Sequence, residues 1–196
     1  MINVEHYNLV AEEKNWSPVL LYKGNLIGYW WFGRWYNQTR VEGIGYYYGA
    51  YPARFLERVE ALLYPVFETG KVLHLFSGTL RGDGDKIVTL DIKPELKPNV
   101  VANAEEMPFQ ENTFDLILAD PPYEDNWKKY GTKKIKKRKV FSECRRVLKP
   151  GGYLVWLDTI VPQWRKAEFQ YRGVVAVLPS TNHKTRTLLF LEVVKS

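Results

Sequence analysis

Four short apolar segments in the second half of this chain constrain its fold more than any other feature. They are KVLHLF, KIVTLDI, FDLILAD and GYLVWLD, at residues 71–76, 86–92, 114–120 and 152–158. Runs of this length and composition are typical of strands in a parallel sheet that is buried on both faces. Helical or loop-forming stretches separate them. The order therefore predicts an α/β fold built on a doubly wound, mostly parallel sheet.

Apolar periodicity predicts two helices next to these strands. In residues 52–63 one stripe of a helix is apolar, and Pro52 suits its first turn. In residues 136–148 apolar residues recur at intervals of three and four, and the sequence KPGG ends the helix. The two stripes consist of Phe55, Leu56, Val59, Leu62 and Leu63 in the first helix, and of Val140, Cys144 and Val147 in the second.

The two ends of the chain predict antiparallel structure. GVVAVLP at residues 173–179 and TRTLLFLEVV at residues 185–194 flank a polar turn, which predicts a C-terminal hairpin that closes one edge of the sheet. Near the N-terminus, YKGNLIGYW predicts a hairpin that turns at Gly24-Asn25. We therefore predict a small, aromatic-rich β appendage over residues 1–50 and a main domain over residues 51–196.

Composition excludes several classes of protein. A chain of 196 residues can bury one core of ordinary size, but not two full domains and a linker. It has no apolar run of about 18 residues, as a membrane span requires, and no signal-like N-terminus. One cysteine and three scattered histidines exclude a disulfide framework and make a metal centre unexpected. These features predict a cytoplasmic protein without metal or membrane attachment.

Positive charge is concentrated in one segment. The net charge is +6, and between Lys128 and Arg146 ten basic residues face a single acid, Glu143. Like charges at this density repel one another unless an anionic partner neutralises them, and a nucleic-acid backbone is the commonest such partner. The alternative is a solvated helix face.

Three segments resemble the class I, Rossmann-like, S-adenosylmethionine-dependent methyltransferases. They are KVLHLFSG, NAEEMPFQENTFDLILADPPY and FSECRRVLKPGGYLVW. The motif DPPY, at residues 120–123, is similar to that of methyltransferases that modify an amino nitrogen of adenine or cytosine in nucleic acid. The resemblance implies a catalytic role for Asp120, Pro121, Pro122 and Tyr123. It covers the chain from about Tyr51 to the C-terminus.

The chemistry of DPPY is consistent with that role. An amino group conjugated to a ring is a poor nucleophile, and acceptors for its hydrogens let the nitrogen become tetrahedral as charge develops. The Asp120 carboxylate and the Pro121 carbonyl can both accept, and Tyr123 can stack on a flipped base. The alternative is an ordinary strand end with a Pro-Pro turn and an exposed tyrosine.

The resemblance also implies where the cofactor, S-adenosylmethionine, binds. Ligands of such folds lie at the carboxyl ends of the strands. Asp91 is expected to bond the ribose hydroxyls. The other expected cofactor contacts are Phe76, Ser77, Gly78, Ile92, Asn103, Ala104 and Asp120.

The chain departs from the family pattern at two positions. His74 stands where the family has an acid, and the turn F-x-G-x-G lacks its second glycine, since Leu80 occupies that position. Glycines reappear at Gly82 and Gly84. His74 is either a packed core residue or a cofactor contact.

The substrate side is less defined. Only 73 residues follow DPPY, too few for a separate recognition domain, so the expected substrate contacts are Trp127, Lys133, Lys134, Lys136 and Lys137. Ten of the 29 aromatic residues lie between Tyr29 and Tyr51, where they could stack on bases, form a small core or build a homodimer interface. The favoured function is methylation of adenine in DNA, with RNA as a possible substrate. The alternative is a non-catalytic methyltransferase fold that binds nucleic acid or an active partner subunit.

Overall fold

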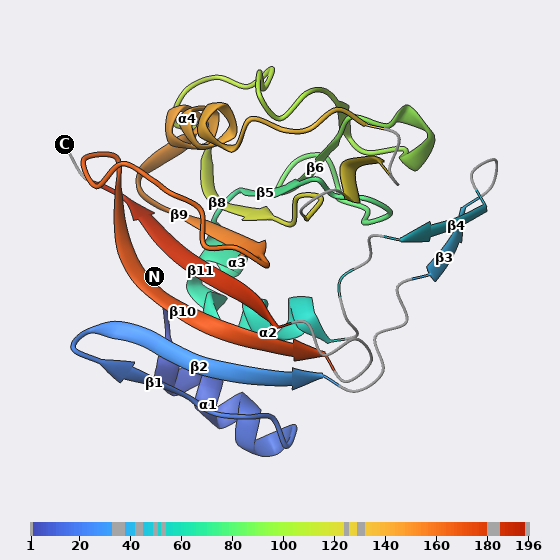
Figure 1. The fold of residues 1–196 in the computed structure, drawn as a ribbon. Helices are drawn as coiled ribbons and strands as arrows, with labels where there is room; N and C mark the ends of the chain where they lie inside the picture. Colours follow the sequence, from blue (N-terminus) through green and yellow to red (C-terminus); the bar gives the residue numbers. More distant parts are fainter. Residues whose placement is uncertain are drawn as a thin grey trace.

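The computed structural model describes residues 2–32, 38–41, 45–48, 51, 54–123, 126–128, 132–179 and 185–194. Nine strands form one twisted sheet in the order β1-β2-β10-β11-β9-β8-β5-β6-β7 (Figure 1). The strands are β1 (Val19–Tyr22), β2 (Asn25–Phe32), β5 (Val72–Leu75), β6 (Ile87–Asp91), β7 (Val100–Val101), β8 (Phe114–Ala119), β9 (Leu148–Asp158), β10 (Phe169–Pro179) and β11 (Arg186–Val193). A separate antiparallel pair consists of β3 (Gln38–Val41) and β4 (Gly45–Tyr48).

The four apolar segments predicted as strands are β5, β6, β8 and β9, and they pair in parallel. From β5 the chain proceeds outward to β6 and β7, and then returns to β8 on the other side of β5. The strand order therefore reverses between β5 and β8, which is the switch point where ligands of doubly wound sheets bind. The prediction of an α/β, mostly parallel sheet is confirmed.

Helices cover both faces of this sheet. The helices are α1 (Val4–Glu13), α2 (Phe55–Leu62), α3 (Tyr64–Thr69) and α4 (Lys137–Val147), with short 3-10 turns η1 (Pro94–Leu96) and η2 (Asn126–Lys128). Alternation along β8 assigns the faces, because Leu118 packs in the cluster with α1 and α2, whereas Ile117 packs in the cluster with α4. The predicted helix over residues 136–148 is confirmed as α4. In the first predicted helix, α2 begins at Phe55 after Arg54, whose φ is +64°.

Two predictions about the C-terminal hairpin and the first turn need correction. Strands β10 and β11 form the expected antiparallel pair, but β10 also pairs in parallel with β2, so the hairpin lies inside the sheet and β1 forms the edge. The first hairpin turns at Lys23-Gly24, not Gly24-Asn25, because Tyr22 pairs with Asn25. Both turn residues have positive φ, which matches the twist of a two-residue hairpin.

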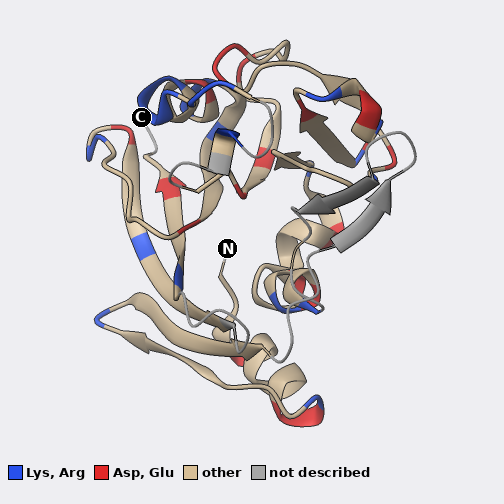
Figure 2. Ribbon diagram, turned by 45° about the vertical axis from the view of Figure 1, so that its right-hand side comes forward, with Lys and Arg blue, Asp and Glu red and all other residues tan. Residues whose placement is uncertain are grey.

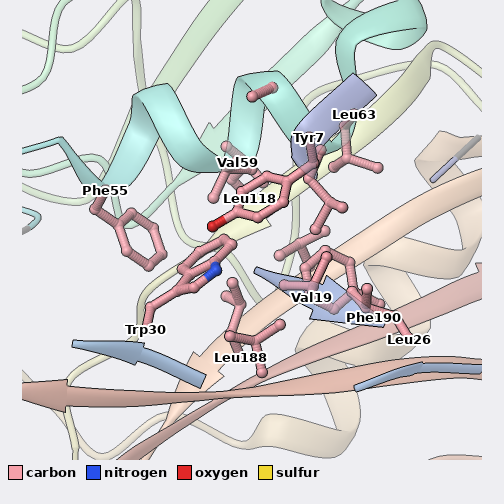
Figure 3. Packing of buried hydrophobic residues seen from close by; sticks show 14 of the residues in the cluster. Tyr7, Val19, Leu26, Trp30, Phe55, Val59, Leu63, Leu118, Leu188 and Phe190 are labelled. Carbon is pink, nitrogen blue, oxygen red and sulfur yellow. The ribbon is translucent and has the colours of Figure 1, made fainter. Parts of the chain in front are cut away.

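The N-terminal strands are continuous with the main sheet, although the sequence predicted an appendage. Trp30 on β2 is fully buried and stacks against Tyr7 of α1, with ring centroids 5.8 Å apart (Figure 3). Phe55 of α2 meets Trp30 edge-on. The Arg58 guanidinium lies 4.4 Å from the ring of Phe32, which joins α2 to β2. The boundary predicted at residue 50 stays a prediction.

Candidate active site

Several polar side chains meet at the carboxyl edge of the parallel strands. Asp91 ends β6, Asp120 directly follows β8, and Asp158 ends β9. The turn that begins at Phe76 directly follows β5, which lies between β6 and β8. Since parallel strands end at the same edge, the topology brings the predicted cofactor and catalytic residues to one place.

The turn after β5 has an unusual backbone. Phe76 has φ of +60° and Gly78 has φ of +57°, and the Leu80 amide donates to the Ser77 carbonyl to close the turn. A positive φ at a bulky residue is rare and is found where surrounding structure holds it, often at functional sites. The Phe76 ring packs edge-on against Trp156, which fixes this turn to β9.

Asp91 is held directly against that turn. One carboxylate oxygen, Oδ2, accepts a hydrogen bond from the Gly78 amide at 3.0 Å, and Oδ1 accepts one from the Lys93 amide at 3.0 Å. The residue is 8% exposed, and burial raises the pKa of its carboxyl group. Each oxygen keeps a lone pair, so Asp91 can still accept hydrogen bonds from two hydroxyls.

The surroundings of Asp91 fit the cofactor that the sequence implies. The Ser77 hydroxyl is buried and has no hydrogen-bond partner among the described residues. Ile92 next to Asp91 and Val101 on β7 are each 52% exposed, so apolar surface flanks the acid. The carboxylate of Asp91 suits the ribose hydroxyls of S-adenosylmethionine, and the hydroxyl of Ser77 suits its amino-acid part. The exposed apolar side chains of Ile92 and Val101 suit its adenine ring.

The predicted adenine contacts lie just after β7. The Ala102 amide donates to the Asp91 carbonyl, which brings this segment against the end of β6. Asn103 is exposed, and its Oδ1 accepts from the Glu105 amide, whereas Ala104 is buried in the core. The structure thus brings the predicted cofactor residues together along the ends of β5, β6 and β7.

The glycines after the turn do not replace the missing one. A Cβ on Gly82 would lie 2.2 Å from the Ile87 carbonyl oxygen, and Gly84 has φ of +83° beside Asn99. Both glycines therefore serve the return of the chain into the start of β6. Leu80 occupies the position of the family's second glycine.

The DPPY segment begins at the switch point. The Tyr123 hydroxyl donates a hydrogen bond to Oδ1 of Asp120, three residues earlier. Burial raises the pKa of Asp120 to about 6, opposed by the Tyr123 hydrogen bond and by the positive charge of Arg186. Pro121 is buried, while Asp120, Pro122 and Tyr123 are partly exposed. The Asp120 carboxyl group is therefore mostly ionised at neutral pH and can accept a hydrogen bond from a substrate.

Three residues near Asp120 were not predicted from the sequence. Arg186, the first residue of β11, is 7% exposed, and its guanidinium carbon lies 4.9 Å from the Tyr123 ring centroid. Tyr51 lies close enough for the negative charge of Asp120 to raise the pKa of its hydroxyl further, beyond the increase caused by burial. Asp158 raises the pKa of Asp120 through like charge. Of the three, only Asp158 could have been found from the sequence, because like Asp91 it is an acid at the end of an apolar strand.

His74 proves to be a buried side chain of the central strand β5. It is 3% exposed, its ring meets that of Tyr51 at 6.4 Å, and burial lowers its pKa to about 4. Its Nδ1 has no hydrogen-bond partner among the described residues. His74 is therefore packed and neutral at physiological pH, as one of the two sequence alternatives proposed.

The structure places Lys137, a predicted substrate contact, against a buried acid, and its contact with a substrate stays a prediction. Its Nζ lies 2.6 Å from Oδ2 of Asp158, whose side chain is 1% exposed. Lys137 is thus the partner of a buried acid and joins the first residue of α4 to the end of β9. Removing it would leave the Asp158 carboxylate buried without its counter-ion.

The remaining basic residues differ in role. Lys133, Lys134 and Lys136 are exposed, and they precede the start of α4, which Lys137 joins to the end of β9. Figure 2 shows basic residues, in blue, gathered on the helix at the upper left, which is α4. Arg146, in contrast, is bound to Glu143 and to the Met107 and Phe109 carbonyls. The run therefore contains both exposed cations beside the site and internal structural ones.

The aromatic residues considered as base-stacking candidates, Trp127 and those of residues 29–51, differ in exposure. Trp127 is partly exposed in η2, and Nζ of Lys128 lies 5.3 Å from its ring centroid. Along β2 the aromatic side chains alternate: Trp30 and Phe32 belong to the core, whereas Tyr29 and Trp31 are 55% and 57% exposed. Trp35 and Tyr36 lie outside the described residues, and nothing is described of the side chains of Tyr46, Tyr47 and Tyr48.

The described residues contain no group of three histidine, cysteine, aspartate or glutamate side chains that could hold a metal ion. No helix in the described part of the chain is long and apolar enough to cross a membrane.

Comparison with known proteins gives a family match over part of the chain. Residues 69–156 match a family described as a methyltransferase domain. The Ubiquinone/menaquinone biosynthesis C-methyltransferase UbiE of Haemophilus ducreyi is 34% identical over 100 residues, which are 50% of this chain and 35% of that protein. The mitochondrial 2-methoxy-6-polyprenyl-1,4-benzoquinol methylase of Caenorhabditis elegans is 41% identical over 69 residues, 35% of this chain and 21% of that protein. The chain thus spans about a fifth to a third of these curated relatives.

Solved structures support the same fold. TrmN of Thermus thermophilus has a TM-score of 0.50 and 17% identity, covering 76% of this chain and 56% of that one. The protein yhhF of Escherichia coli has a TM-score of 0.51 and 13% identity, covering 81% of this chain and 99% of that one. These solved structures show the fold alone. The match to a methyltransferase domain favours S-adenosylmethionine as the cofactor.

Proposed function

We propose that this methyltransferase domain transfers a methyl group to an exocyclic amino nitrogen of a nucleic-acid base, with adenine in DNA as the first candidate and RNA as the second. One observation carries the proposal. Asp120 of DPPY lies at the switch point, at the same sheet edge as Asp91, and its carboxylate is mostly ionised at neutral pH. S-adenosylmethionine supplies an electrophilic methyl group when bound.

The residues divide into two roles. Asp91, Ser77 and Ile92 would hold the cofactor at the ends of β5 and β6. The Asp120 carboxylate would accept a hydrogen bond from the substrate amino group, which increases the electron density that the nitrogen can offer to the methyl group. The Pro121 carbonyl would accept a hydrogen bond from the second hydrogen of the amino group. The following proline restricts the backbone at Pro121 to an extended form, which holds this carbonyl in one orientation.

The charge distribution supports a polyanionic substrate. Lys136, Arg138 and Lys139 lie at the N-cap and in the first turn of α4, a turn that contains no acid, beside Lys137, which pairs with Asp158. Cations at this end of a helix oppose its dipole, so an anion that approaches Lys136, Arg138 and Lys139 relieves an unfavourable interaction. The exposed Lys133 and Lys134 lie just before this helix in the sequence and add to its positive charge.

A second candidate function comes from the names of the curated relatives. They are quinone and quinol C-methyltransferases, which favours methylation of carbon in a small aromatic molecule. A carbon nucleophile of a quinol needs a base for its hydroxyl, and Asp120 could serve in that role as well. The basic surface beside the site has no evident use in that reaction.

A transfer assay distinguishes the two functions. The protein would be incubated with methyl-labelled S-adenosylmethionine and, in parallel, unmethylated duplex DNA, single-stranded DNA, structured RNA or a demethylated benzoquinol. We expect label in nucleic acid, recovered after hydrolysis as an N-methylated base. Label in the quinol alone would replace the proposal by the second candidate. Tight cofactor binding without transfer to any of the four substrates would favour a non-catalytic binding protein.

A further inference from the structure

Arg186 is a buried cation beside the proposed catalytic loop. It begins β11, directly before Thr187, which pairs with Asp158 at the end of β9. The side chain is 7% exposed, and burying a guanidinium is costly unless its surroundings stabilise the charge. Its guanidinium carbon lies 4.9 Å from the ring centroid of Tyr123, within the range of a cation–π interaction.

Tyr123 in turn contacts Asp120. Its hydroxyl donates to Oδ1, and among the described residues no other side chain donates to this carboxylate. A carboxylate has two oxygens, and a bond to one of them fixes the orientation of the other. Two interactions therefore connect β11, the DPPY loop and the end of β8.

We propose that Arg186 is a positioning residue: it holds the ring of Tyr123 so that the hydroxyl stays on Oδ1 of Asp120 and leaves Oδ2 directed toward the substrate. The proposal rests on the function proposed above for Asp120. It assigns a role in the reaction to a residue 66 positions away in the sequence and outside every recognised motif.

The charges around Asp120 support this role. Tyr123 from its own loop, Arg186 from β11, Asp158 from β9 and Tyr51 from the segment before α2 all act on it or on its partner. Of these, Arg186 is the one positive group, and it lowers the pKa of Asp120 against burial and Asp158. His74, which lies against Tyr51, has a pKa of about 4 and is neutral at physiological pH.

The first test measures Asp120 without any substrate. The carboxyl carbons of aspartates are labelled with ¹³C, the Asp120 signal is assigned with Asp120→Asn, and the protein is titrated. Wild-type Asp120 should titrate near pH 6. In Arg186→Met the midpoint should rise by about one unit, because a nearby opposite charge is lost. Arg186→Lys should stay close to the wild type, since it keeps the charge.

Arg172→Met is the matched control. Arg172 is another arginine of the C-terminal hairpin and is half-buried, but its Nε lies 2.5 Å from Oε2 of Glu192, at the other end of β11 from Arg186. Its loss should leave the Asp120 midpoint unchanged. An Asp120 midpoint that is the same in folded Arg186→Met as in the wild type would overturn the inference.

The second test asks whether Arg186 acts through Tyr123. The turnover number is measured for Arg186→Lys, Tyr123→Phe and the double variant. Arg186→Lys cannot present the same planar face to the ring, so we expect a loss of about tenfold in turnover with an unchanged KM for the cofactor. If Arg186 works through Tyr123, the double variant should be no slower than Tyr123→Phe. If the loss of turnover in the double variant equals the product of the two single losses, the inference is contradicted. This test does not depend on Arg186→Met, so it holds even if that variant fails to fold.

The two tests separate this inference from the proposed function. Fully active Asp120→Asn would refute the proposed function whatever the titration shows. An essential Asp120 whose titration ignores Arg186 would refute only the positioning role.

Discussion

At the scale of single residues, Asp91 and Asp120 are two acids with different surroundings, Asp91 being buried and Asp120 partly exposed. Both oxygens of Asp91 accept backbone amide bonds, so its orientation is fixed before any ligand arrives. Asp120 has one described partner, the hydroxyl of Tyr123. We therefore assign Asp91 to holding the cofactor and Asp120 to the reacting substrate.

The first prediction follows from this division. Asp91→Ala should weaken S-adenosylmethionine binding at least tenfold, because two ribose acceptors are lost and the turn after β5 loses its bond from Gly78. Asp120→Ala should leave the affinity within a few-fold. Isothermal titration calorimetry of both variants provides the measurement. Equal losses, or none at Asp91, would show that the ribose is placed wrongly.

The second prediction concerns the free energy of unfolding that is lost because the pKa of Asp120 is raised in the folded protein. Its pKa in the folded protein, about 6, is above the ordinary value of 3.8. Well below the ordinary value both states are protonated and nothing is lost. Between the ordinary pKa of 3.8 and the folded pKa of about 6, the unfolded state releases its proton while the folded state keeps it, so the free energy of unfolding decreases over this range and stays lower above it, by roughly 2–3 kcal/mol in all. Asp120→Asn avoids this loss and should be more stable than wild type at pH 7.

Urea unfolding of both proteins at pH 4 and pH 7 checks this prediction. Since His74 is present in both, the difference between them isolates residue 120. A difference that is the same at the two pH values would contradict the raised pKa. A larger advantage of Asp120→Asn at pH 7 than at pH 4 would instead place Asp120 among the residues at which a protein gives up stability for function.

At the scale of elements, the pairing of β10 with β2 depends on a residue without a side chain. Gly173 has φ of +149°, and a Cβ there would lie 2.4 Å from the Leu26 carbonyl oxygen. Gly173→Ala should therefore destabilise the protein by about 2–4 kcal/mol, through backbone strain and a clash with β2.

Gly24→Ala is the matched comparison for that variant. Gly24 also has positive φ, +75°, but a Cβ there would meet no atom within 4 Å. The expected cost is about 1 kcal/mol, from strain alone. Urea denaturation followed by tryptophan fluorescence reports on both, since Trp30 is buried on β2. Similar costs for the two variants would mean that the close approach of β10 and β2 contributes little.

The basic surface before α4 yields a fourth prediction. Replacing Lys133, Lys134 and Lys136 by glutamine should weaken nucleic-acid binding on every sequence and reduce the slope of log affinity against log salt by roughly 2–3. Lys137 is left intact because it pairs with Asp158. The measurement is fluorescence anisotropy at several salt concentrations, on single-stranded and duplex ligands.

Lys23, Lys97 and Lys166 form the charge-matched control. All three are exposed, and they belong to the first hairpin, the segment after η1 and the segment before β10. Their replacement by glutamine should leave the salt slope almost unchanged. The same slope in both triple variants would identify the basic run as a solvated surface.

At the scale of the whole molecule, the sequence predicted the parallel half of the fold well. Buried strands such as β5 and β8 are continuous apolar runs, and their order follows from local pattern alone. The position of β2 did not follow, because its pairing with β10 joins residues nearly 150 positions apart. Alternation of Trp30 and Trp31 indicated a strand, but not its neighbour.

The site divides in the same way. Phe76, Asp91 and Asp120 each directly follow or end a recognisable strand, so their meeting at one edge was predictable. Arg186 and Tyr51 reach Asp120 only through the tertiary fold. The pairing of Lys137 with Asp158 was not predictable, because the sequence gives the charge of a residue but not its partner, and the position of Lys137 at the start of α4 places it against Asp158.

The central claim is that Asp120 acts on the nucleophile of an S-adenosylmethionine-dependent reaction. The most direct test is the single-turnover rate of methyl transfer to nucleic acid by wild type and Asp120→Asn, both saturated with cofactor. We predict a loss of about 100-fold or more in the variant, with cofactor affinity preserved and the protein at least as stable at pH 7. A variant that transfers methyl groups at the wild-type rate would contradict the account.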